Sequence, residues 1–240
     1  YTTLFRSINK KMPLAKLKEL FFDIFFPKFC LNCKKEGSYI CKECEIFISE
    51  NFLICPICKN PSFFGETHKE CKRRYGIDGL VSIWDYDGII KMGICSAKDS
   101  GIFDVITELT ERAFYALSLE QNRRFKYFLS FLLIEDFHIF YVPMKGKKEK
   151  ERGFNQSEII AKKFGKIFNK TPLPFLKKRA DLSEWRKDNF YVVKEDLKEF
   201  KKAVLIDDFL FSGETIKECA RVLKKAGIEE IWGFTLGRAV

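Results

Sequence analysis

The chain has 240 residues, 46% hydrophobic and 32% charged, which is enough apolar material for a sizeable core and excludes an intrinsically disordered protein. Its longest apolar run, residues 128–134, is much shorter than the ~20 residues that cross a bilayer, so a membrane-spanning protein is not expected. The net charge of +10 is typical of nucleic-acid binding. However, the excess of Lys over Arg and the abundance of Phe and Ile are equally expected from AT-rich coding.

The first residues are set apart from the rest of the chain. Residues 1–7 read as the translation of a sequencing-adapter oligonucleotide, so we expect a native start near Met12 and treat 1–12 as a non-native or disordered start. Between residues 13 and 26, apolar residues recur at helical spacing before Pro27. This pattern predicts a short helix packed on the body of the protein; the alternative is a helix lying on a membrane surface.

Seven of the nine cysteines lie between Cys30 and Cys71. No secretory signal is evident, so clustered thiols indicate metal ligands rather than disulfides. Four pairs share a spacing of two intervening residues, which lets one tight turn direct two side chains at one ion: Cys30 and Cys33, Cys41 and Cys44, Cys55 and Cys58, His68 and Cys71. Thiolate and imidazole ligands in groups of four predict two structural zinc sites.

The short gaps between adjacent pairs favour sequential sites, in which the first two pairs bind one zinc ion and the last two pairs bind the other. A cross-braced arrangement, pairing first with third, is the alternative. The bound thiolates would cancel much of the positive charge of residues 1–74.

Downstream of the cysteines, strands and helices alternate. Strands are predicted at residues 79–86, 137–144, 189–193, 203–206 and 230–236, and helices at 103–119, 157–168 and 214–226. The run 203–206 is wholly apolar, as expected for a buried parallel strand. This order predicts an α/β fold with a parallel sheet.

Two carboxylates, Asp207 and Asp208, follow the apolar run 203–206, and the loop after them leads through Ser212 and Gly213 into a helix. Ligands bind at the carboxyl ends of parallel strands, and a helix N-terminus offers N–H groups and a positive dipole to a phosphate. The carboxylates suit sugar hydroxyls or a Mg²⁺ ion accompanying the phosphate. These parts together predict a site for a phosphorylated sugar; the alternative is that the two carboxylates only cap the helix.

Residues 206–215, Ile-Asp-Asp-Phe-Leu-Phe-Ser-Gly-Glu-Thr, resemble the phosphoribosyl-pyrophosphate motif of type I phosphoribosyltransferases. With the cysteine pairs and residues 151–157 (Glu-Arg-Gly-Phe-Asn-Gln-Ser), the chain resembles the ComF family of competence proteins. The resemblance extends from residue 13 to 240. It implies an N-terminal helix and double zinc ribbon at 13–74, followed by a type I phosphoribosyltransferase-like domain at 75–240.

The resemblance also implies roles by position. Asp207 and Asp208 would contact the ribose hydroxyls and take the catalytic position. The remaining implied contacts to phosphoribosyl pyrophosphate (PRPP) are to its phosphate groups: Ser212, Gly213, Glu214, Thr215, Lys98, Met144, Lys145 and Arg152.

The chain departs from the family pattern at three places. Phe211 stands where the family usually has Thr, Lys145 replaces the second Pro of a Val-Pro-Val-Pro pattern, and residues 179–190 are shorter than the family's lid segment. A shorter lid weakens the exclusion of water from a cationic glycosyl transition state. No His–carboxylate pair stands out as acid and base for a nucleobase. The sequence therefore indicates binding more clearly than catalysis.

Residues 141–187 hold 14 basic and 5 acidic side chains. A basic groove with aromatic platforms would bind single-stranded DNA, with Phe154, Phe175 and Trp185 as stacking residues. The candidate DNA contacts are Lys147, Lys148, Lys150, Arg152 and Arg186. The alternative is a solvated lysine-rich face around buried aromatic residues.

We therefore expect a cytoplasmic ComF-like protein that binds PRPP and single-stranded DNA and acts with the DNA-uptake machinery in natural competence, with peripheral contact at the inner face of the membrane. One alternative is an active phosphoribosyltransferase in nucleotide salvage. The other is a zinc-ribbon adaptor with a vestigial enzyme fold.

Overall fold

The computed structural model describes residues 25, 27–119, 123–144, 153–179, 189–194 and 196–239. The chain divides into two compact units, Tyr1–Ile46 and Phe47–Val240. The predicted start at 1–12 and, except for Phe25, the predicted helix up to residue 26 lie outside the described residues. Because the division falls between the two predicted metal sites, each site belongs to a different unit. The predicted domain boundary after residue 74 stays a prediction.

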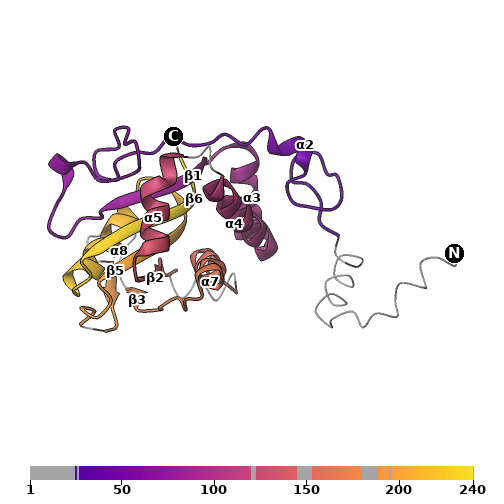
Figure 1. The fold of residues 1–240 in the computed structure, drawn as a ribbon. Coiled ribbons are helices and arrows are strands. Elements are labelled where there is room, and N and C mark those ends of the chain that lie inside the picture. Colours follow the sequence, from indigo (N-terminus) through magenta and orange to yellow (C-terminus); the bar gives the residue numbers. More distant parts are fainter. Residues whose placement is uncertain are drawn as a thin grey trace, which may run out of the picture. The chain divides into compact units, whose positions relative to one another are not determined.

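The core of the larger unit is a four-stranded parallel sheet in the order β1-β6-β5-β2 (Figure 1). Its strands are β1 (Gly79–Asp85), β2 (Phe137–Tyr141), β5 (Lys202–Leu210) and β6 (Glu230–Arg238). In the register of the central strand β5, Val204 lies opposite Trp232 on β6 and Ile139 on β2. Residues 203–206 are fully buried, as a strand covered on both faces requires. The predicted α/β fold with a parallel sheet is confirmed.

Helices cover both faces of this sheet. On one face, α8 (Glu214–Lys225) buries Ile216 and Cys219 in the cluster that contains Leu205 and Phe140. The other face is covered by α4 (Phe103–Ser118), α5 (Lys126–Ile134) and α7 (Gln156–Phe168). Helix α3 (Gly88–Ser100) packs on α4.

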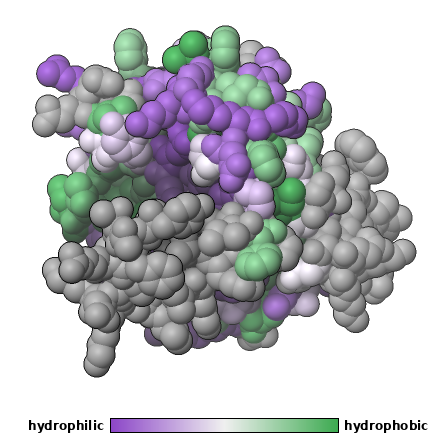
Figure 2. Space-filling view, turned by 90° about the vertical axis from the view of Figure 1, so that its right-hand side faces the viewer, coloured by the Kyte–Doolittle hydropathy of each residue, from purple (hydrophilic) through white to green (hydrophobic). Residues whose placement is uncertain are grey.

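Phenylalanines fill the core on the second face. Phe114 contacts Phe164 edge-on with ring centroids 4.9 Å apart, and Phe234 of β6 stacks 6.0 Å from Phe128. Such pairs stabilise a core beyond the area they bury. The coloured residues in Figure 2 are mostly hydrophilic, with hydrophobic side chains in small separate patches. Much of the unusual Phe content is therefore core material.

The predicted strands and helices downstream of the cysteines are present, but several begin or end at other residues than predicted. Strand β5 continues past the predicted end through the carboxylate pair to Leu210, whereas β2 ends at Tyr141 rather than residue 144. Besides short helices, the sequence did not predict α3, α5 or β3 (Leu176–Lys178), which pairs antiparallel with β4 (Phe190–Val192). Helix α5 is apolar along most of its length, so it lacks the periodicity that reveals a helix. Short helices complete the description: α2 (Lys42–Glu45), η2 (Lys69–Cys71) and η3 (Arg123–Phe125).

Buried Asn51 fastens the segment that precedes β1 to the sheet. Its main-chain N–H donates to Ile83 O at 3.2 Å, and its Nδ2 donates to Trp84 O at 3.2 Å. Its Oδ1 accepts a hydrogen bond from Arg238 Nη2 at the end of β6. Further along, Leu80 N donates to Gly65 O at 2.8 Å, and an added Cβ at Gly65 would lie 2.4 Å from Leu80 O. The segment carrying the second cysteine group is therefore held against β1.

Candidate functional site

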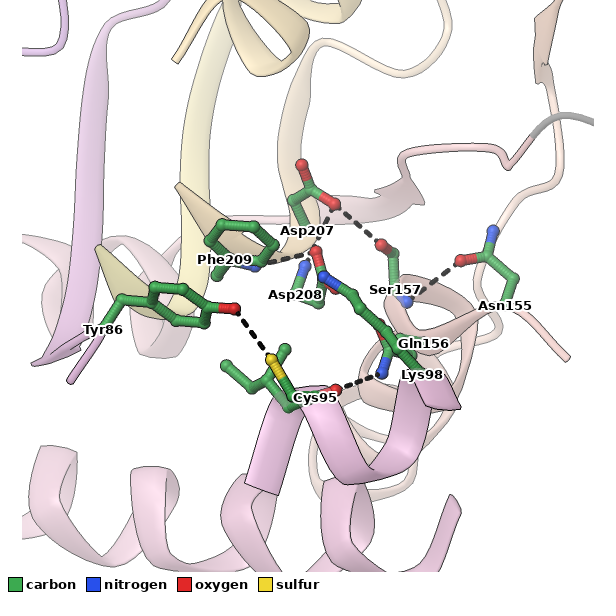
Figure 3. A network of polar contacts seen from close by, with 10 residues as sticks. Tyr86, Cys95, Lys98, Asn155, Gln156, Ser157, Asp207, Asp208 and Phe209 are labelled. Atoms are coloured by element: carbon green, nitrogen blue, oxygen red, sulfur yellow. Dashed lines mark hydrogen bonds and ion pairs between the residues drawn. The ribbon is translucent and has the colours of Figure 1, made fainter. Parts of the chain in front are cut away.

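The carboxylate pair lies near the carboxyl end of β5, half-buried in a hydrogen-bonded network (Figure 3). Asp207 Oδ1 accepts hydrogen bonds from Ser157 Oγ at 2.8 Å and from the main-chain N–H of Asp208 at 3.0 Å. Burial, and secondarily the charge of Asp208, raise the pKa of Asp207 to about 8. The structure thus holds a carboxyl group that binds a proton near neutral pH.

Lys98 faces the second carboxylate of the pair. Its Nζ lies 3.0 Å from Asp208 Oδ2 and 4.0 Å from the centroid of the Phe209 ring, where a cation is attracted to the π face. Tyr86, just after β1, stacks on Phe209 with ring centroids 4.3 Å apart and donates to or accepts from Cys95 Sγ at 3.4 Å. Lys98, which the resemblance implied as a phosphate contact, lies in the last turn of α3.

The start of α7 supplies the third side of the network. Asn155 caps this helix by accepting a hydrogen bond from Ser157 N at 3.1 Å, and its Nδ2 donates to Val142 O at 3.0 Å. Gln156 Nε2 donates to Ile94 O of α3 at 3.1 Å. These bonds connect α7 to the end of β2 and to the middle of α3, and thereby direct Ser157 at Asp207. The Asn-x-Ser sequence was the available signal for this cap.

A loop behind the pair leads into α8. Gly213 has φ 79°, a left-handed conformation that glycine adopts without strain, and Glu214 N donates to Ser212 Oγ at 3.4 Å. A hollow of about 210 Å³ runs along this loop and is lined by Asp207, Asp208, Phe209, Leu210, Phe211, Ser212, Gly213, Thr215 and Ile216. The structure therefore brings together the carboxylates, Lys98 and three of the predicted phosphate-loop residues. Glu214 lies beside them and pairs with Lys217.

Of the remaining predicted phosphate and DNA contacts, the structure describes only Met144. Met144 is half-buried after β2, while Lys145, Lys147, Lys148, Lys150, Arg152 and Arg186 lie outside the described residues.

The metal ligands form two groups of four, each with its ligand atoms within 4.8 Å of one another. The groups are Cys30, Cys33, Cys41 and Cys44, and Cys55, Cys58, His68 and Cys71. Each could hold a metal ion, and their composition follows the sequential arrangement rather than the cross-braced one.

Both groups begin with the same turn. Lys34 N donates to Cys30 O at 3.0 Å and Lys59 N donates to Cys55 O at 2.9 Å, and both lysines have a positive φ near 62°. In the second group, His68 Nε2 lies 3.1 Å from Pro61 O while Nδ1 faces Cys58 Sγ at 3.4 Å. A proton on Nε2 leaves Nδ1 free of a proton, as metal coordination requires. The donor set and its support thus fit zinc.

Comparison with known proteins agrees with this geometry. Residues 150–236, which hold the carboxylate pair and its loop, match the phosphoribosyl transferase domain. The chain is 23% identical to competence protein ComFC of Streptococcus pneumoniae over 218 residues, 87% of this chain and 80% of the relative. It is 23% identical to competence protein F of Haemophilus influenzae over 236 residues, 90% of this chain and 99% of the relative. Together these findings support assignment of the chain to the ComF family.

The ComFC protein of Bacillus subtilis is likewise 23% identical, over 85% of this chain and 86% of the relative. Across the ComF-family alignments the similarity therefore extends through most of the chain, beyond the transferase domain.

The described residues of the basic stretch 141–187 largely make contacts within the protein. On α7, Lys162 pairs with Glu158 at 2.6 Å and Lys163 pairs with Glu111. Phe175 packs edge-on against Phe140 and Phe200 in the core. The described residues thus offer few free basic groups on α7, and Phe175 is core rather than a stacking platform.

Among the residues that the structure describes, no helix is long and apolar enough to cross a membrane.

Proposed function

We propose that this ComF-family protein binds PRPP, or a closely related phosphorylated ribose, at the carboxylate pair and the loop before α8. The observation that carries the proposal is that Asp207, Asp208 and the N-terminus of α8 line one hollow, while Lys98 pairs with Asp208 at 3.0 Å. A helix N-terminus behind a Ser-Gly turn suits a 5′-phosphate. Paired carboxylates suit vicinal hydroxyls, with Mg²⁺ carried in by the pyrophosphate.

In this account the network rearranges when the ligand arrives. Lys98 leaves Asp208 and pairs with the pyrophosphate, and Asp208 is then available for a ribose hydroxyl or the Mg²⁺ ion. Asp207 keeps its hydrogen bond from Ser157 and releases its proton as the cation approaches, because positive charge lowers the pKa of a carboxyl. Ser212 and Thr215 add hydroxyl donors to the N–H groups of α8.

We propose binding rather than turnover as the main role. Phe211, which is 77% exposed, contributes no hydroxyl to the phosphate loop. Among the described residues, no His–carboxylate pair faces the hollow. The second candidate, an active phosphoribosyltransferase in nucleotide salvage, is supported by the intact carboxylate pair. It differs in one measurable respect, because only an enzyme releases pyrophosphate when a nucleobase is added.

The relatives named as competence proteins support a competence-related role, and we propose that the protein acts in the cytoplasm with the DNA-uptake machinery. The basic residues of 141–187 then bind the incoming single strand. Such binding would weaken steeply with salt. In a plot of the logarithm of the binding constant against the logarithm of the salt concentration, each neutralised phosphate of a single strand makes the slope more negative by ~0.7. Two zinc ions, one in each group of four ligands, hold the N-terminal region in shape.

Thermal unfolding with and without Mg²⁺-PRPP tests the proposal. A ligand present at about 100 times its Kd stabilises the folded state by ~2.7 kcal/mol, so the Tm rises by several degrees. The rise should shrink in Asp208→Asn and Thr215→Ala, and persist in full in Asp104→Asn, which changes an exposed carboxylate on α4. An unchanged Tm for the parent protein contradicts the proposal, and pyrophosphate release with any nucleobase favours the enzyme.

A further inference from the structure

A second pocket, of about 360 Å³, lies beside the phosphate hollow and shares Phe211, Ser212 and Gly213 with it. Its floor is apolar and comes from Ile54, Leu80, Leu210 and Ile216. This volume is in the range of small-molecule sites, which are mostly apolar with a few convergent polar groups. Nothing in the proposed binding of phosphate and ribose uses this space.

One wall of the pocket belongs to the second metal-binding group. Pro56 and Lys59 line this wall. Pro56 directly follows the metal ligand Cys55, and Lys59 directly follows the metal ligand Cys58, in the first turn of that group. The turn is held by hydrogen bonds from Cys55 N to Asn60 O and from Lys59 N to Cys55 O, both 2.9 Å long. The conformation of this wall therefore depends on the conformation of the turn.

Two exposed aromatic rings and one buried guanidinium surround the pocket. Phe52 is 56% exposed and Phe211 is 77% exposed, so both rings are accessible to a ligand in the pocket. Arg238 is 7% exposed and its guanidinium lies 5.0 Å from the centroid of the Phe52 ring. Its Nη2 donates to Asn51 Oδ1, but buried Nε has no hydrogen-bond partner among the described residues. Arg238 lines the pocket, so its guanidinium places a positive charge beside any ligand bound there.

We propose that this pocket binds a nucleobase whose sugar phosphate occupies the phosphate loop, and that metal binding at Cys55, Cys58, His68 and Cys71 maintains its outer wall. Every base has an aromatic face for Phe52 or Phe211, and carbonyl or ring-nitrogen acceptors for Arg238. The inference rests on the proposed phosphate site next to it. The base belongs either to a free nucleotide or to the 5′-phosphorylated end of a single strand.

Titrations of the full-length, zinc-loaded protein with three probes test the pocket: ribose 5-phosphate, 2-aminopurine riboside and 2-aminopurine riboside 5′-monophosphate. We expect the nucleotide to bind ~10-fold more tightly than ribose 5-phosphate, because stacking of one base on an aromatic side chain is worth that factor or more. Phe52→Ala should remove this gain and leave the affinity for ribose 5-phosphate unchanged. Phe63→Ala is the matched control, because Phe63 is 91% exposed in the same segment and does not line the pocket.

Two further variants test whether base binding depends on the metal ion of the second group. Cys58→Ser removes a ligand of the second group and Cys33→Ser removes one of the first, and both cysteines are exposed. We expect each variant to lose one zinc ion, but only Cys58→Ser to lose the gain from the base. If Cys58→Ser does not fold, Lys59→Ala, which alters the same wall without touching a ligand, still tests the wall.

The outcomes separate this inference from the proposed function. Equal affinity for ribose 5-phosphate and the nucleotide in the parent overturns the pocket and leaves the phosphate site intact. Binding of the riboside without any binding of ribose 5-phosphate supports the pocket and overturns the phosphate site. Equal loss of base binding in Phe52→Ala and Phe63→Ala also overturns the pocket. Comparing oligonucleotides with a 5′-phosphate and a 5′-hydroxyl then decides between a strand end and a free nucleotide.

Discussion

Ser157 at the start of α7 donates a hydrogen bond to Asp207 on β5 across 2.8 Å, joining residues 50 positions apart in the chain. The bond aims one oxygen of the carboxylate and opposes the effect of burial, because hydrogen bonding to the charged form lowers the pKa of Asp207. Ser157 thereby acts as a positioning residue for the carboxylate pair.

Replacing this hydroxyl should weaken ligand binding without unfolding the protein. We expect Ser157→Ala to reduce the affinity for Mg²⁺-PRPP ~5- to 10-fold, the equivalent of one hydrogen bond of about 1 kcal/mol. The pKa of Asp207 should rise as well, so the pH profile of binding shifts upward. Ser157→Thr, which keeps a hydroxyl, should restore both, and Ser118→Ala on α4 is a control that should change neither. An unshifted pH profile in Ser157→Ala would contradict the positioning role.

The raised pKa of Asp207 predicts how stability varies with pH. The folded state holds this proton up to a pKa of about 8, whereas the unfolded carboxyl releases it near its ordinary pKa of 3.8. Between these values the folded state binds more protons, so the free energy of unfolding contributed by Asp207 falls as the pH rises. Asp207→Asn, whose Oδ1 still accepts from Ser157, should flatten the profile and be more stable than the parent at pH 8 by on the order of 2 kcal/mol.

Urea unfolding at pH 5 and pH 8 measures this difference, with Asp104→Asn as the control for the loss of one carboxylate. If the free energy of unfolding of the parent, relative to that of Asp207→Asn, increases from pH 5 to pH 8, the carboxyl is ionised in the folded state and the prediction is wrong.

Buried Asn51 should be among the most sensitive positions outside the site. Asn51→Ala removes the Nδ2 donor to Trp84 O and the Oδ1 acceptor of Arg238 Nη2. Among the described residues, this Nη2 then keeps only Phe52 O, at 3.3 Å. Each buried polar group that loses a partner costs ~1–3 kcal/mol. We expect the Tm to fall by roughly 10 °C or more, with loss of the wall beside the phosphate loop. Asn60→Ala is the control, because Asn60 is exposed and its contact with Cys55 uses only the main chain. Equal Tm values for the two variants would refute the fastening role.

Metal analysis should find two zinc ions per chain. Removal by a strong chelator should lower the Tm, because metal binding energy at such sites contributes to folding. The first turns of the two groups are alike, so the ions should be released in two steps that Cys33→Ser and Cys58→Ser each reduce to one. A single ion per parent chain, or disulfides in the protein purified under reducing conditions, would contradict the assignment.

Local spacing predicted the metal ligands and the carboxylate pair, because ligand pairs and a strand–loop–helix are contiguous in the chain. The partners of that pair were harder to predict. Lys98 lies in a helix that the sequence did not reveal, and Ser157 faces Asp207 only because α7 packs beside β5. Tyr86 stacks on Phe209 through the parallel register of β1, β6 and β5, which depends on long-range packing. The roles of the basic residues 145–152 stay predictions.

The central claim is that the pair Asp207 and Asp208 binds a phosphorylated ribose. Calorimetric titration of Mg²⁺-PRPP into the parent, the double variant Asp207→Asn/Asp208→Asn and the control Asp104→Asn tests it most directly. We predict saturable one-site binding in the parent and the control, and at least ~100-fold weaker binding in the double variant, since two charge-assisted contacts are lost. Absence of binding to the parent, or equal affinity in all three proteins, would contradict the claim.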